Sequence, residues 1–128
     1  MTHGVRMDVK EPKPTRTDME PTWDIIIQEY DEGLWGWGRA MGDENKREII
    51  RLMEERRDFG FRKHGVHLTP DNGRNDKNDS LQELADFMAY TRNMMRCNPD
   101  STYISRQLSE IFNTSIQIFE KFVDLDMK

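Results

Sequence analysis

The sequence predicts an all-α fold, a bundle of about three to five helices that is completed by oligomerisation. Glu, Lys, Arg, Met and Leu are common and β-branched residues are sparse, a composition that favours helices. Long stretches of the second half repeat apolar residues every three or four positions, as amphipathic helices do. The chain has 128 residues, of which 34% are charged, so we expect one thin core with well-solvated faces.

Composition and charge exclude several classes of protein. No apolar run approaches the roughly 18 residues of a membrane span, and the N-terminus lacks the apolar core of a secretory signal. Cys97 is the only cysteine, which rules out an intrachain disulfide and suits a reducing cytosol. The net charge of −5 argues against a protein that coats nucleic acid, although divalent cations allow an acidic protein to handle a phosphorylated substrate. We expect a cytoplasmic protein with no membrane partner.

The N-terminal part of the chain divides into two segments. Residues 1–20 mix Lys, Arg, Thr, Pro and acids with no apolar period, and we expect a flexible tail. Residues 21–128 are expected to form one domain. This domain begins with TWDIIIQEY, which fits a short helix or a strand, because periodicity cannot decide over so few residues. A glycine-rich stretch follows, and its two rings, Trp35 and Trp37, either pack at the edge of the core or form a platform for a nucleobase.

A helix is predicted from Asp43, a good N-cap, to about Phe59, where Gly60 ends it. Its apolar residues point to one side and its acids to the other. The next segment, residues 60–78, is rich in Gly, Asn and Asp and predicts a long loop. A loop of this length in a small domain is usually functional or mobile.

A second long helix is predicted from Asp76 or Asp79 to about Arg96. Ser80 and Glu83 also fit a capping box, which would begin the helix later.

The last predicted helix begins at residue 100 or 101 and ends near residue 125. Its apolar residues form two adjacent stripes that cover about half of the circumference at roughly 100° per residue. One neighbouring helix rarely buries so much surface, so a bundle partner or a second subunit is implied.

The helix that precedes Arg96 carries acids on one face. Asp79, Glu83, Asp86 and Tyr90 fall within an arc of about 60° at roughly 100° per residue, opposite the apolar residues. One interpretation is a solvated acidic face. The other is one wall of a metal site, because these acids lack basic partners at i+3 and i+4 and because the preceding helix repeats the acidic pattern. Clustered carboxylates repel one another unless a cation neutralises them, and carboxylate oxygens are ligands that Mg²⁺ prefers.

The acidic residues also carry a resemblance to a known family. EERRD at residues 54–58, followed after 24 residues by ELAD at residues 83–86, resembles the EExxE…ExxD signature of the MazG-like all-α nucleoside triphosphate pyrophosphohydrolases. LQELADFMAYTRNMM is similar to the second metal helix of that family. The intervening segment looks most like small phage-encoded members, in which G-x-x-K-x-G-x-x-L precedes N-G-R. The resemblance covers about residues 45–95, and Asp58 stands where the family pattern has Glu.

The resemblance implies cleavage of a (d)NTP between its α and β phosphates, which gives the monophosphate and pyrophosphate. The implied cofactor is Mg²⁺, with Mn²⁺ as the alternative ion, and the implied assembly is a homodimer or homotetramer. Carried over position by position, the metal ligands are Glu55, Asp58, Glu83 and Asp86. The residues expected in catalysis are Glu54, as an accessory acid, Glu55 and Glu83. A phage-encoded member would act in the host cytoplasm.

Basic side chains of the predicted loop between the two acidic helices are candidates for binding the triphosphate. A metal ion neutralises only part of the negative charge of a triphosphate, so basic side chains must neutralise the rest. Arg74 is the first choice for this role, followed by Lys63. The alternative for Arg74 is a solvated residue beside an Asn-Gly turn. The residues expected to contact substrate are Lys63, His64, Asn72, Arg74, Tyr90, Trp35 and Trp37. Zinc is not expected, because the two histidines of the H-x-x-H spacing lack further His or Cys ligands.

The sequence therefore predicts a Mg²⁺-dependent nucleotide pyrophosphohydrolase, without specifying base or sugar. The alternative, from another class, is a non-catalytic helical oligomerisation or adaptor module, which the doubly apolar last helix and the charged tail also suit. DNA binding through Arg56, Arg57, Arg62 and Lys63 is a weaker hypothesis. Those bases interleave with acids and the net charge is negative, so no nucleic-acid partner is expected.

Overall fold

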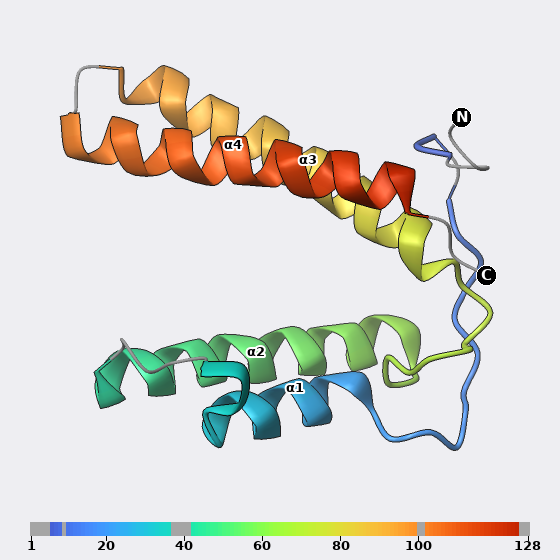
Figure 1. Ribbon diagram of the computed structural model, residues 1–128. Coiled ribbons are helices and arrows are strands. Elements are labelled where there is room, and N and C mark those ends of the chain that lie inside the picture. The colour runs from blue at the N-terminus through green and yellow to red at the C-terminus, as the bar shows by residue number, and fades with distance from the viewer. Residues whose placement is uncertain (1–5, 9, 37–41, 100–101, 126–128) are drawn as a thin grey trace. The chain divides into compact units, whose positions relative to one another are not determined.

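The structure, a computed structural model, describes residues 6–8, 10–36, 42–99 and 102–125, and for Trp35 and Thr102 it describes the backbone alone. Throughout these ranges the regular elements are helices (Figure 1). They are α1 (Thr22–Asp31), the 3-10 turn η1 (Leu34–Gly36), α2 (Asp43–His64), α3 (Asp76–Cys97) and α4 (Thr102–Asp124). The predicted all-α class is confirmed, and its completion by oligomerisation stays a prediction. None of the described helices has both the length and the apolar character that a bilayer crossing requires.

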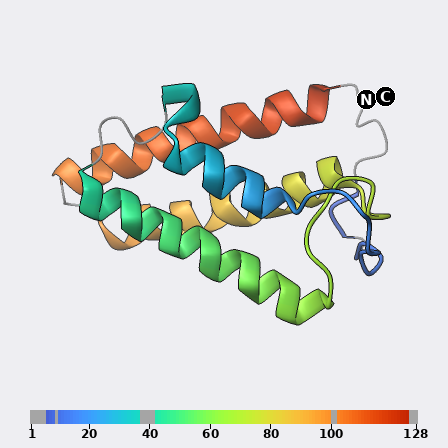
Figure 2. The ribbon, with the colours of Figure 1, turned by 90° about the horizontal axis from the view of Figure 1, so that it is seen from below.

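The chain divides into two compact units, each built on a pair of packed helices. The α1–α2 unit comprises Pro12–Arg74, and the α3–α4 unit comprises Met1–Glu11 and Asn75–Lys128. In both Figure 1 and Figure 2, α1 lies beside α2 and α4 lies beside α3. A single domain for residues 21–128 stays a prediction.

The segment that fitted a helix or a strand is helix α1. Its half-buried and buried apolar side chains, Trp23, Ile26, Ile27 and Tyr30, recur at i, i+3, i+4 and i+7, which is helical spacing. Arg57 of α2 donates a hydrogen bond to this helix, with 3.3 Å between its Nη1 and Oδ1 of Asp24. An ion pair therefore supplements the apolar contact between α1 and α2.

Helix α2 runs past Gly60, so the predicted end at Phe59 is wrong. The helix ends at Gly65, whose φ of 74° is left-handed and whose N–H donates to the carbonyl of Phe61 at 2.7 Å. Glycine adopts this conformation at little cost, which makes it the usual residue after a helix. Gly60 lies inside the helix, where a glycine lowers helix stability without ending the helix.

The longer α2 also corrects the predicted loop. Arg62, Lys63 and His64 form the last turn of α2, where positive charge interacts favourably with the free carbonyls of the helix end. Lys63 and His64, which were expected in the loop, are therefore helical residues. The loop is shortened to residues 65–75.

We expect Gly60→Ala to raise the free energy of unfolding by about 0.5–1 kcal/mol, because alanine favours the helix. No atom lies within 4 Å of the place that its Cβ would take. Gly65→Ala is the matched change and should lower stability by about 1–2 kcal/mol, because alanine is strained at positive φ. Urea unfolding followed by circular dichroism measures both changes. The two substitutions should change the free energy of unfolding in opposite directions. Changes in the same direction would contradict the assigned end of α2.

Helix α3 begins at Asp76, which is one of the two predicted starts. Asn75 caps it, since its side-chain oxygen accepts a hydrogen bond from the backbone N–H of Asn78 at 2.9 Å. The capping box that Ser80 and Glu83 would form is therefore not used. As a consequence, Asp79 lies inside the helix, one turn before Glu83.

The core of the α3–α4 unit is thin, as the composition predicted. Leu81 is fully buried and Leu108 nearly so, and these are the buried apolar side chains that the structure describes in this unit. Three polar side chains that the structure describes in this unit, Asn78, Thr91 and Ser115, are buried as well. Thr91 and Ser115 each donate the hydroxyl to a carbonyl of the preceding turn, and the side-chain oxygen of Asn78 accepts from the backbone N–H of Arg6, so none of the three is buried unsatisfied.

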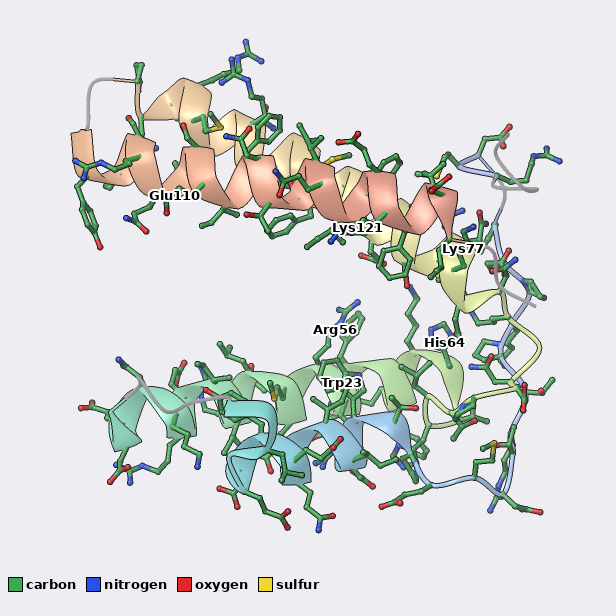
Figure 3. All side chains as sticks on the ribbon, viewed as in Figure 1. Trp23, Arg56, His64, Lys77, Glu110 and Lys121 are labelled. Carbon is green, nitrogen blue, oxygen red and sulfur yellow. The ribbon has the colours of Figure 1, made fainter. Side chains whose placement is uncertain are left out.

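Lys77 of α3 holds the C-terminal end of α4 (Figure 3). Its ammonium donates to the carbonyl of Val123, at 3.4 Å, and to that of Leu125. The last carbonyls of a helix have no partner within the helix, so a lysine at this place satisfies them.

The described part of residues 1–20 makes hydrogen bonds to the loop that follows α2. The backbone N–H of Thr15 donates to the carbonyl of Asn72 at 2.7 Å, and the hydroxyl of Thr17 donates to that of Thr69, also at 2.7 Å. These bonds lie within the α1–α2 unit. The flexibility of the whole tail stays a prediction.

Candidate functional site

The four predicted metal ligands divide equally between the two units. Glu55 and Asp58 lie on α2, and Glu83 and Asp86 lie on α3. In each helix the two carboxylates are three residues apart, which places them on one face with about 5–6 Å between their Cβ atoms.

The α2 pair lies on the side of its helix opposite the apolar residues, as the sequence pattern predicted. Glu55 and Asp58 are exposed, whereas Ile49, Ile50 and Met53, on the opposite side of the helix, are half-buried. Glu54, the predicted accessory acid, is exposed as well. The helix thus positions these carboxylates outward, opposite a half-buried apolar side.

Arginines neutralise both members of the α2 pair. Arg51 donates from Nη1 to Glu55 and from Nε to Glu48, the second bond measuring 2.9 Å. Arg57 donates from Nε to Asp58 at 3.0 Å. The sequence interpretation missed these partners, although the spacing of Arg51 and Glu55, at i and i+4, was a readable signal.

The ion pairs shift the pKa values of three of these groups. The hydrogen bond from Arg51 lowers the pKa of Glu48 below its ordinary value, and the same bond raises the pKa of Arg51. The hydrogen bond to Asp58 is the largest cause of the raised pKa of Arg57. All these groups are at or near the surface, where solvent screens such interactions.

We expect Arg51→Gln to raise the pKa of Glu48, because the substitution removes the donor that stabilises its carboxylate. The folded pKa of Glu48 lies below its unfolded value, so this pair stabilises the fold above the unfolded pKa. That stabilisation is lost as the pH falls through the folded pKa. A carbon-detected NMR titration of the Glu48 carboxyl group measures the shift. Arg47→Gln is the control and should leave the pKa of Glu48 unchanged. The same Glu48 pKa in the wild type and in both variants would contradict the assigned pair.

The α2 pair also lines an open hollow of about 560 Å³ on the surface of α2. The other residues that line it are Leu52, Arg56, Phe59 and Arg62. The guanidinium of Arg56 lies over the ring of Phe59, 5.0 Å from its centroid, and the side chain points away from α1 (Figure 3). Two carboxylates, two guanidinium groups and two apolar side chains therefore share one surface, which suits a ligand that is anionic at one end.

The α3 pair differs in having no basic partner. Glu83 and Asp86 are exposed, and among the described residues neither forms an ion pair or a side-chain hydrogen bond. Tyr90, one turn further along the same face, is 65% exposed. The face thus offers two uncompensated carboxylates beside an accessible aromatic ring.

No three side chains from the His, Cys, Asp and Glu residues within the described part of either unit are grouped so that they could hold a metal ion. Each carboxylate pair by itself supplies two ligands, fewer than Mg²⁺ takes, although water commonly completes its shell.

Asn72 and Arg74, both predicted to contact substrate, organise the loop after α2. Asn72 is buried, and its side-chain oxygen accepts from the backbone N–H of Arg74 at 3.1 Å. Arg74 in turn donates from Nη1 to the carbonyl of Pro12 at 2.9 Å. The turn between them needs Gly73, whose φ is 87°. Contact of Asn72 and Arg74 with substrate stays a prediction.

The remaining predicted substrate contacts are spread over the chain. Lys63 is exposed and His64 half-buried, both on the last turn of α2. Trp35 belongs to η1, and Trp37 lies outside the described residues.

Comparisons of the chain with models of protein families, with curated proteins and with solved structures found no match. The resemblance to the MazG-like enzymes therefore rests on the sequence motifs alone.

Proposed function

We propose that the chain is a Mg²⁺-dependent nucleoside triphosphate pyrophosphohydrolase that converts a (d)NTP to the (d)NMP and pyrophosphate. One observation carries the proposal. Helices α2 and α3 each present an exposed Glu-x-x-Asp pair, and the α3 pair has no basic partner in the described part of the chain. Uncompensated carboxylates one turn apart repel each other, and a bound cation relieves that repulsion.

The chemistry of the donor set fits Mg²⁺. The proposed ligands are Glu55, Asp58, Glu83 and Asp86, which offer only oxygen atoms. The arginines that neutralise the α2 pair are exposed ion-pair partners, and exposed pairs exchange at little cost. When bound, Mg²⁺ supplies charge neutralisation of phosphate oxygens and a lowered pKa of a coordinated water.

The other side chains act on the substrate itself. Arg56 and Arg62, which line the hollow beside the α2 pair, bind phosphate oxygens, since a guanidinium group matches phosphate geometry. Lys63 adds charge one residue further along α2. Glu54 acts as an accessory acid, and Tyr90 stacks on the base or contacts the sugar. Water adds to the α phosphorus and releases a proton to solvent. The bond from the α phosphorus to the bridging oxygen breaks, and that oxygen leaves with pyrophosphate.

Incubation of the purified chain with each of the common (d)NTPs and Mg²⁺ tests this function. Pyrophosphate and orthophosphate are quantified separately. We expect pyrophosphate in amounts equal to the monophosphate, no product in EDTA, and recovery with added Mg²⁺ or Mn²⁺. Orthophosphate as the only product, or no product from any nucleotide, would contradict the proposal.

The many exposed apolar side chains of both units favour a second candidate, the non-catalytic helical adaptor. Calorimetric titration with Mg²⁺ or Mn²⁺ and a non-hydrolysable nucleotide separates the two candidates. Heat of binding and a raised melting temperature support the enzyme. Absence of both favours the adaptor.

A further inference from the structure

A short N-terminal segment lies along the first turns of α3, within the α3–α4 unit (Figure 1). The backbone N–H of Arg6 donates to the side-chain oxygen of Asn78 at 2.9 Å, and the carbonyl of Arg6 accepts from Nε2 of Gln82 at 3.2 Å. Further along the segment, Glu11 accepts from the backbone N–H of Asn75, the N-cap of α3, at 2.6 Å. The segment is therefore held on α3 at both of its ends.

The anchor of this segment is a buried side chain. Asn78 is 5% exposed, and both ends of its amide bond the segment, since its oxygen accepts from Arg6 and its Nδ2 donates to Glu11 at 3.5 Å. A buried amide without partners is costly, so Asn78 stabilises the bound position of the segment. Arg6 consequently has a defined place on α3.

That place is beside the acidic face of α3. Asn78, Gln82 and Asp86 are each four residues apart and form one row along the helix. Arg6 bonds the first two members of this row, and the third belongs to the α3 carboxylate pair. Glu83, the other carboxylate, directly follows Gln82. The side chain that holds the carbonyl of Arg6 is therefore within about one helical turn of both carboxylates.

A nucleotide bound through these carboxylates needs positive charge that α3 does not supply. A divalent ion neutralises only part of the charge of a triphosphate, so a basic side chain beside it is required. From Asp76 to Met88, α3 carries one basic residue, Lys77, whose ammonium is bonded to carbonyls at the end of α4. Arg6 brings a guanidinium group, which matches the geometry of phosphate oxygens.

The guanidinium of Arg6 is paired with a neighbour in its own segment. Its Nε lies 3.6 Å from Oδ1 of Asp8, and the two side chains are 64% and 82% exposed. Exposed ion pairs of this kind contribute little to stability. A phosphate group therefore displaces Asp8 at low cost, while the backbone bonds of Arg6 keep its side chain beside the carboxylates.

We propose that Arg6 is a phosphate-binding residue of the site that the α3 carboxylate pair forms. Its backbone stays bonded to Asn78 and Gln82, and its guanidinium moves from Asp8 to a phosphate oxygen of the metal-bound nucleotide. The inference rests on the proposed function, and it assigns a substrate contact to a segment for which the sequence predicts none.

Steady-state kinetics of Arg6→Gln tests the proposal. We expect KM for the best substrate of the (d)NTP panel to rise about 10-fold, because a hydrogen bond to a charged group is lost. The kcat should stay within about 2-fold of wild type, since the contact is made equally in the ground state and the transition state. Arg6→Lys keeps the charge and should recover part of the loss.

The control is Arg106→Gln, which makes the same change of charge in the same unit. Arg106 is an exposed arginine in the first turns of α4, at the end of that helix remote from Lys77, and its substitution should leave KM unchanged. A wild type without activity would overturn the proposed function and this inference with it. An active wild type whose KM is the same in Arg6→Gln would overturn the inference alone.

Calorimetric titration separates phosphate binding from support of the carboxylates. The affinity for a non-hydrolysable (d)NTP in the presence of Mg²⁺ should fall about 10-fold in Arg6→Gln, whereas the affinity for Mg²⁺ alone should not fall. Weaker binding of Mg²⁺ alone would show that Arg6 supports the metal site rather than binding phosphate, and would overturn the inference.

Discussion

Glu83→Gln is expected to lower the rate of pyrophosphate release by more than about 100-fold while the helical circular dichroism signal stays unchanged. Loss of a residue that merely supports a metal ligand typically costs about 10- to 100-fold, and loss of a ligand should cost more. Glutamine keeps the size of the side chain and removes its charge. Because Glu83 is exposed and without an ion pair in the described part of the chain, the fold loses no contact. Initial rates with the best substrate of the (d)NTP panel measure the effect.

The control for this substitution is Glu120→Gln. Glu120 is an exposed glutamate of α4, outside the proposed site, and the change of charge is the same. Its rate should stay within about 2-fold of wild type, since surface substitutions away from specific features have small effects. Equal rates for the two variants would remove Glu83 from the proposed metal site.

Leu81→Ala is expected to lower the free energy of unfolding by about 2–5 kcal/mol. Leu81 is fully buried in the described part of a unit whose apolar core is small, and the substitution leaves a cavity that few neighbours can fill. For a domain of about 100 residues each kcal/mol lowers the melting temperature by roughly 4–8 °C. Thermal unfolding followed by circular dichroism therefore measures a large decrease.

Met94→Ala is the matched change on the same helix. Met94 is 47% exposed, so its truncation should cost less than about 1 kcal/mol. If the two variants melt at the same temperature, Leu81 is not the core residue that its burial indicates.

The sequence predicted helix type and face better than helix ends. The face of α3 followed from the opposite placement of Leu81 and Glu83, because a helix repeats every 3.6 residues whatever it packs against. The end of α2 did not follow, because Gly60 and Gly65 look alike in sequence. Only the backbone conformation, which is left-handed at Gly65, separates a tolerated glycine from a terminating one.

The candidate site was predictable residue by residue but not as an arrangement. The spacing of Glu55 and Asp58 determines that they share a face of α2, and local rules reach that far. The role of Asn72 within its loop depends on Thr15, 57 positions away in the chain, and no local pattern predicts such a bond. Arg51 could have been recognised from its spacing to Glu55, whereas the bond from Arg57 to Asp24 of α1 needed the fold.

The central claim is that the carboxylate pair of α3 binds a divalent metal ion. Mn²⁺ bound together with a non-hydrolysable (d)NTP tests it most directly, because Mn²⁺ broadens NMR signals of nearby amides. We expect the amides around Glu83 and Asp86 to broaden at substoichiometric Mn²⁺, and Glu83→Gln to abolish the broadening. Unbroadened amide signals around Glu83, or broadening that Glu83→Gln leaves in place, would contradict the claim.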